Sequence, residues 1–196
     1  IRMVWRSVPA QLAKENRKFI YGMVKEGARA KDFELAIEWL MDAGLIYKVN
    51  RVKKGGIPLS VYEDFSAFKL FLLDTGLMGA MSGLPPRALL EGNVLFTDYK
   101  GAITEQYVLQ QLKSIKGLNI YYWSSDTSRS ELDFLIQKDV LIIPVEVKAE
   151  ENLQSKSLRS FVEKNTALHG VRFSMSDYRE QDWMTNYPLY SVGYVL

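Results

Sequence analysis

The chain has 196 residues, and its 47% hydrophobic and 24% charged content is typical of a globular protein. It contains no cysteine, which excludes a disulfide scaffold, a thiolate metal site and a cysteine nucleophile, and its single histidine, His169, excludes histidine-rich zinc sites. No apolar run approaches the ~20 residues of a membrane span, and the start has no signal-peptide pattern. We therefore predict a cytoplasmic protein with no membrane partner.

The net charge of +2 conceals an asymmetry between two parts of the chain. Residues 1–62 contain 12 Lys and Arg against 6 Asp and Glu, a net charge of +6. Residues 63–196 contain the other 13 and 17, a net charge of −4, and the two values add to +2. Such a division indicates two modules with different partners. The basic module suits a nucleic-acid backbone, and the acidic module suits a divalent cation.

The first predicted module covers residues 1–64. A helix is expected from Ser7 as its N-cap, with Pro9 in the first turn, and residues 18–24 are ambiguous between helix and strand. An amphipathic helix over 31–43 ends at Gly44, and a strand over 45–52, a turn and a returning strand over 58–62 follow it. Helices followed by a basic hairpin favour a winged-helix-like α+β domain.

This module carries the predicted DNA contacts, which are basic residues able to reach phosphates: Arg17, Lys18, Lys25, Arg29, Lys31, Arg51, Lys53 and Lys54. If these residues act together, DNA affinity falls steeply with salt. The alternative is a small helical packing domain with a solvated lysine hairpin, because winged helices also mediate protein contacts.

Residues 65–97 are predicted to connect the modules. Their first part is strongly apolar and predicts a short strand or turn, then a helix that starts near Asp74 or Thr75. Pro85 and Pro86 break the pattern, and a helical turn is expected at 87–91.

Residues 98–196 predict an α/β domain. A long helix over 98–116 precedes strands at 119–124, 131–136 and 140–148, then a helix at 155–166 and closing strands at 171–173 and 189–192. The order is α-β-β-β-α-β, an α/β layered arrangement.

Charged residues interrupt the two central apolar strands of this domain. Side chains alternate along a strand, so Glu146 and Lys148 share one face, and Asp133 on the preceding strand can meet them. Buried charges must be paired or bind a metal. Mg²⁺ takes one or two carboxylates with several waters, which Asp133 and Glu146 can supply. Such a metal site suits phosphodiester cleavage, in which a metal ion neutralises developing charge and water is the nucleophile. Glu105, on the long helix, is a candidate third metal ligand and catalytic residue. Lys148 can hold the attacking water or stabilise the charge that develops on the phosphate.

Two other interpretations remain open from the residues alone. The charged residues could form cross-strand ion pairs on a solvated sheet edge. The domain could also serve to bind a partner without catalysis.

Asp133, then Glu146-Val147-Lys148 thirteen residues on, with Glu105 on an upstream helix, resembles the PD-(D/E)xK nuclease superfamily with its restriction-endonuclease-like fold. The whole chain is similar to the C-terminal region of a large bacterial and archaeal family of AAA-type P-loop ATPases. The stretches that carry this similarity include residues 8–13, 27–34, 39–45, 68–77, 121–123, 131–136 and 144–148.

The resemblance implies a winged-helix-like segment, a nuclease-like domain and an ATPase module upstream. The sequence contains no G-x-x-x-x-G-K-[ST], so ATP would bind only to that other module. The absence of an initiator methionine at Ile1 likewise predicts a piece of a longer protein. The expected cofactor is Mg²⁺ or Mn²⁺, and the expected partners are DNA and the protein's own ATPase module. A homo-oligomer is left open.

Overall fold

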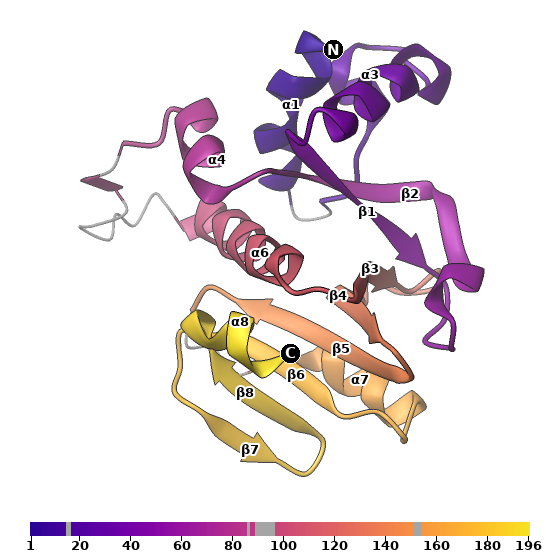
Figure 1. Ribbon diagram of the computed structural model, residues 1–196, viewed down its shortest axis with the longest axis vertical. Helices are drawn as coiled ribbons and strands as arrows, with labels where there is room; N and C mark the ends of the chain where they lie inside the picture. The colour runs from indigo at the N-terminus through magenta and orange to yellow at the C-terminus, as the bar shows by residue number, and fades with distance from the viewer. Residues whose placement is uncertain (15–16, 86, 89–96, 151–153) are drawn as a thin grey trace. The chain divides into compact units, whose positions relative to one another are not determined.

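The computed structural model describes residues 1–14, 17–85, 87–88, 97–150 and 154–196. Two compact units are present, unit 1 (1–49 and 67–107) and unit 2 (50–66 and 108–196). Residues 50–66, which include the predicted turn and returning strand, group with residues 108–196 in unit 2. None of the helices in the described ranges is long and apolar enough to cross a membrane. Figure 1 labels the elements.

Unit 1 contains four helices over its described residues, together with parts of three longer elements. The helices are α1 (Arg2–Leu12), α2 (Tyr21–Val24), α3 (Ala30–Asp42) and α4 (Thr75–Ser82). It also takes the first part of β1 (Ile46–Val52), the end of β2 (Glu63–Leu72) and the first part of α6 (Thr97–Ser114). Its core is apolar and includes Val8, Leu40, Val49, Phe71 and Met78.

Several helix ends in unit 1 follow from local chemistry. The Asp74 side chain caps α4 by accepting a 2.7 Å hydrogen bond from Leu77 N, as the predicted start near Asp74 requires. Gly44, with a φ of 69°, follows α3 in the left-handed region that glycine tolerates. The ambiguous segment 18–24 contains the short helix α2. The predicted start of the first helix at Ser7 is wrong, because α1 begins at Arg2 and has Pro9 in its interior. The helical turn expected at 87–91 falls largely outside the described residues.

Unit 2 contains the ends of β1 and α6, the start of β2, and most of the strands. Its other elements are η1 (Leu59–Tyr62), β3 (Leu118–Ser124), β4 (Glu131–Lys138), β5 (Leu141–Lys148), α7 (Lys156–Lys164), β6 (Gly170–Ser174), β7 (Arg179–Gln181), β8 (Met184–Pro188), η3 (Leu189–Ser191) and α8 (Val192–Val195). Its core packs α7 residues Leu158, Phe161 and Val162 with side chains such as Leu135 and Ile142 of the strands.

The eight strands of the described residues form a mixed sheet with the order β2-β1-β3-β4-β5-β6-β8-β7. The pairs β3–β4 and β4–β5 are antiparallel, and β5–β6 and β6–β8 are parallel. Helix α7 links β5 to β6 and packs on β4, β5 and β6. The element order from α6 to β6 is therefore α-β-β-β-α-β, as predicted, within a mixed α/β fold.

Two predicted strands are wrong. Residues 59–62 form a 3₁₀ turn instead of the returning strand of a hairpin, and Leu59 N donates to Gln137 Oε1 at 2.8 Å. The strand itself starts only at Glu63 and runs for 10 residues. Residues 189–192 lie in a 3₁₀ turn and the start of α8 instead of a closing strand, whereas the strands β7 and β8 before them were not predicted.

Candidate functional site

The charged residues of β4 and β5 lie together in unit 2. Lys148 Nζ lies 2.6 Å from Glu146 Oε1, so both side chains project from the same face of β5. Asp133 Oδ2 accepts a hydrogen bond of 2.7 Å from the backbone N–H of Val147. The paired residues of β4 and β5 end with Phe134 and Val145. The N–H of Val147 lies beyond this last pair and donates to the Asp133 carboxylate instead. The sequence-predicted trio is thus in one place.

The strand registers show what lies beside this trio. Glu146 is opposite Arg172 of β6, and Arg172 is opposite Asn186 of β8. Because opposite residues of parallel strands project to the same face, these three polar side chains form a row. Two residues earlier on β6 and β8, the same face of the sheet has Gly170 and Met184. Met184 belongs to the α7 core, so this face of the sheet changes from apolar to polar toward the carboxyl ends of β5 and β6.

Glu146 is strongly desolvated. Its side chain is 8% exposed, and its Oε2 atom is buried with no hydrogen-bond partner among the described residues. Burial raises the pKa of Glu146, and the neighbouring Asp133 raises it further, whereas Lys148 and Arg172 lower it. The raised pKa shows that burial and like charge outweigh the two cations.

A metal fits this site only through two carboxylates. Among the described residues, no group of three or more His, Cys, Asp or Glu could hold a metal ion. Asp133 and Glu146 provide a pair of hard oxygen donors, and the buried Glu146 Oε2 is an acceptor that a cation could use. Mg²⁺ accepts such a set, since one or two carboxylates with waters complete its shell. The donor set therefore fits Mg²⁺ or Mn²⁺.

Crowding of the two acids does not by itself demand a cation. Asp133 and Glu146 carry two negative charges when ionised, and Lys148 and Arg172 carry two positive charges beside them. These two cations offset part of the repulsion between the acids, and metal binding at this site stays a prediction. Sequence reasoning did not include Arg172, although an arginine inside the apolar stretch Val171-Arg172-Phe173 is the same signal that marked Glu146.

Glu105 belongs to unit 1, and both of its oxygens contact cations there. Lys69 Nζ lies 3.2 Å from Oε1, and Arg17 Nη1 pairs with Oε2. Glu105 and Lys69 are completely buried, and Arg17 is 21% exposed. These contacts give Glu105 a structural task, and its predicted role as a metal ligand stays a prediction.

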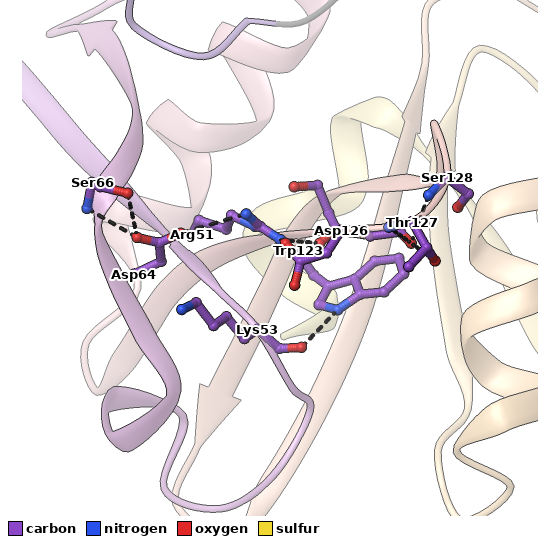
Figure 2. A network of polar contacts seen from close by, with 10 residues as sticks. Arg51, Lys53, Asp64, Ser66, Trp123, Asp126, Thr127 and Ser128 are labelled. Carbon is purple, nitrogen blue, oxygen red and sulfur yellow. Dashed lines mark hydrogen bonds and ion pairs between the residues drawn. The ribbon is translucent and has the colours of Figure 1, made fainter.

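Arg51, another predicted DNA contact, is engaged in a polar network of unit 2 (Figure 2). Its Nη2 donates to the Ser124 carbonyl at 2.9 Å and pairs with Asp126, and its Nη1 lies 3.4 Å from Asp64. The Trp123 indole N–H donates to the Lys53 carbonyl at 3.3 Å. Arg51 thus joins β1, β2 and the start of the β3–β4 loop, and the Lys53 side chain is exposed beside it.

The other predicted DNA contacts differ in exposure. Lys25, Arg29, Lys31 and Lys54 are exposed, and Lys18 is half-buried. The Arg29 backbone N–H donates to Asp32 Oδ2 at 2.8 Å, so the Asp32 carboxylate caps the start of α3, where Arg29 is the N-cap residue. The exposed side chains are available for phosphates, whereas Arg17 and Arg51 have carboxylate partners within the protein.

A cavity of about 430 Å³ lies elsewhere, in unit 1. Residues of α1, the end of α4 and Tyr99 line it, and Arg6 is its charged side chain. None of the predicted site residues is among the residues that line it.

Residues 100–192 match the family described as Domain of unknown function (DUF4143). Residues 1–88 match a second, described as Domain of unknown function (DUF8612). Each match covers just under half of the chain. DUF4143 is a domain often found at the C-terminus of AAA ATPases, which agrees with the resemblance noted from the sequence. No curated protein and no solved structure matches the chain. The segment that matches DUF4143 contains Glu105, Asp133, Glu146, Lys148 and Arg172.

Proposed function

We propose that the DUF4143 segment is a nuclease-like module that binds one Mg²⁺ or Mn²⁺ and hydrolyses phosphodiester bonds of DNA, as the C-terminal part of a P-loop ATPase. The observation that carries the proposal is the convergence of Asp133, Glu146 and Lys148, with the buried Glu146 Oε2 open to a cation. The order α-β-β-β-α-β, with β5 and β6 parallel, supports the restriction-endonuclease-like assignment.

Each residue has a chemical task in this proposal. Asp133 and Glu146 hold the ion, which when bound supplies Lewis-acid stabilisation of the charge that develops on the phosphate. The backbone N–H of Val147 fixes the Asp133 carboxylate through its 2.7 Å hydrogen bond. The Lys148 side chain is 34% exposed, so its ammonium can orient the attacking water or stabilise the phosphate while it contacts Glu146.

The basic residues of 1–62 serve in this proposal to bind the DNA backbone. Lys25, Lys31 and Lys54 are exposed, so their ammonium groups can reach DNA phosphates. Such contacts add affinity without sequence preference and make it dependent on salt. A winged-helix-like segment remains part of the proposal, although its returning strand differs from the expected hairpin.

Plasmid nicking by the 196-residue chain with Mg²⁺ or Mn²⁺ tests the nuclease proposal. Asp133→Ala and Lys148→Ala are expected to reduce cleavage by about 10²-fold or more. The matched controls are Asp182→Ala and Lys164→Ala, which change exposed residues of unit 2. Cleavage that persists in both site variants would exclude this site.

A second function is favoured by one observation, the balance of Asp133 and Glu146 by Lys148 and Arg172. A site that is already neutral can persist without turnover, as a module that recognises DNA or a protein partner for the ATPase. Calorimetry separates the two proposals. Absent Mn²⁺ binding, with salt-sensitive DNA binding retained, would support the recognition module.

A further inference from the structure

An arginine is fully buried in the middle of the polar row of unit 2. Arg172 is 0% exposed, and its neighbours in the row, Glu146 and Asn186, are 6% and 0% exposed. Arginine is almost never fully buried unless it is paired, because removing its charge from water is costly. A buried Arg172 therefore needs hydrogen-bond or charge partners inside the fold.

Those contacts hold the guanidinium in one orientation. Its Nε donates to Asn186 Oδ1 at 2.8 Å, and its Nη1 donates to Ser155 Oγ at 3.3 Å. Ser155 is the residue that precedes α7. The planar guanidinium has fixed donor directions, so two anchored nitrogens also define where the rest of the group points.

Asn186 is itself fixed, so the anchor is rigid. Its Oδ1 also accepts from Ser174 Oγ at 2.7 Å. Its Nδ2 donates to the carbonyls of Asp177 at 2.7 Å and Ser176 at 3.3 Å. With both ends of the amide in use, neither rotation nor an amide flip is possible without the loss of several hydrogen bonds.

The other side of the row contains the carboxylate. Glu146 is the cross-strand neighbour of Arg172, and an attraction acts between their charges. Asp133 repels Glu146, and Lys148 contacts only its Oε1. A carboxylate between a like charge on one strand and an arginine on the other is drawn toward the arginine.

We propose that Arg172, anchored by Asn186 and Ser155, is a positioning residue that orients the Glu146 carboxylate for metal binding. The inference rests on the proposed function, because it assigns Arg172 a task at the same site. Arg172 acts through Glu146 and does not touch the ion. Residues that orient a metal ligand in this way typically contribute 10- to 100-fold to metal affinity or activity.

Calorimetric titration of the 196-residue chain with Mn²⁺ alone tests this inference. We expect Arg172→Gln to bind Mn²⁺ about 10- to 100-fold more weakly than wild type. Arg172→Lys should recover part of the loss, because it restores the charge without the fork of donors. Arg159→Gln is the matched control, since Arg159 is 64% exposed on α7 and should leave the affinity unchanged.

A second variant covers the case in which Arg172→Gln does not fold. Asn186→Ser keeps the arginine and removes its Asn186 anchor, and thermal melting without metal shows whether each variant is folded. Weaker Mn²⁺ binding by folded Asn186→Ser, and a lower kcat for nicking with an unchanged KM for DNA, support the inference. A purely structural role would lower the melting temperature and leave these two quantities unchanged.

The possible failures are distinct. If wild type binds Mn²⁺ and the folded Arg172 and Asn186 variants bind it equally well, the positioning role is overturned and the metal site stands. If wild type itself does not bind Mn²⁺, the proposed metal-dependent function is overturned, and the positioning role with it.

Discussion

Lys69 Nζ lies 3.2 Å from Glu105 Oε1, and neither side chain is exposed to solvent. Arg17 pairs with the other oxygen of the same carboxylate. A buried acid with two cations costs free energy to desolvate, but the removal of one partner leaves an uncompensated charge, which costs more. The ion pairs of Glu105 with Arg17 and Lys69 therefore stabilise the fold of unit 1.

Glu105→Ala is expected to lower the free energy of unfolding by about 3–5 kcal/mol, because the buried Lys69 loses this carboxylate. Urea denaturation measures the change. Glu38→Ala, on the exposed face of α3, is the control and should leave the midpoint unchanged. An equally stable Glu105→Ala that no longer binds Mn²⁺ would restore the interpretation of Glu105 as a metal ligand.

Much of unit 2 could be predicted because its signals are local. The apolar runs of β4 and β5 and the alternation of Glu146 and Lys148 give the strands and the shared face without knowledge of the fold. Asp74 and Gly117 mark helix ends by their own chemistry, and Gly117 has a φ of 81° just beyond α6. Features of this kind depend on a few consecutive residues.

The missed features depend on distant partners. Strand β7 has three residues, and β8 contains Asn186, so neither has an apolar pattern of its own. The segment around Leu59 alternates like a strand, but Gln137, 78 residues away, accepts its backbone N–H. Arg172 meets Glu146 and Asn186 only through the registers of three strands, which no single segment of sequence encodes.

The raised pKa of Glu146 predicts a pH dependence of stability. Asp133 on β4, Lys148 on β5 and Arg172 on β6 face this carboxyl, and burial with Asp133 prevails over the two cations. A carboxyl whose pKa is higher in the folded chain binds more protons when folded. Its stabilising contribution is complete below the ordinary pKa of glutamate and is lost as the pH rises through the folded pKa.

The variant Glu146→Gln does not titrate at this position. We expect the stability of wild type relative to Glu146→Gln to fall as the pH rises from the ordinary pKa of glutamate to the raised value. The loss is about 1.4 kcal/mol for each unit between the two pKa values. Urea unfolding of both proteins from about pH 4 to pH 8 measures it. A difference that stays constant, or that grows in favour of wild type, would contradict the assigned shift.

Arg51 and Lys54 form a natural pair for separating structure from DNA contact. Arg51→Ala removes the links to Asp64, Asp126 and the Ser124 carbonyl (Figure 2) and should lower the free energy of unfolding by about 1–3 kcal/mol. Lys54 is exposed, so Lys54→Ala should leave the urea midpoint unchanged.

DNA binding should depend on Lys54 and not on Arg51. Fluorescence anisotropy with a duplex at several salt concentrations should show weaker binding by Lys54→Ala and a salt slope reduced by about one. Folded Arg51→Ala should keep the wild-type slope, because its guanidinium is committed to carboxylates. A reduced slope for Arg51→Ala alone would instead make Arg51 the phosphate contact.

Asp133 offers a last pair of variants, because its carboxylate accepts the Val147 N–H and is also the proposed metal ligand. An asparagine oxygen can accept the same hydrogen bond, whereas alanine cannot. Without metal, Asp133→Ala should therefore lose about 1–3 kcal/mol of stability and Asp133→Asn clearly less. Urea unfolding measures both values.

With Mn²⁺ the two variants should behave alike. At a concentration of 100 times Kd, a ligand that binds only the folded chain adds about 2.7 kcal/mol of stability, and wild type should show this gain. Both variants should lose most of it, because each lacks the Asp133 charge that binds the ion. If Mn²⁺ stabilises all three proteins equally, the ion binds elsewhere and Asp133 serves only to hold the β5 backbone.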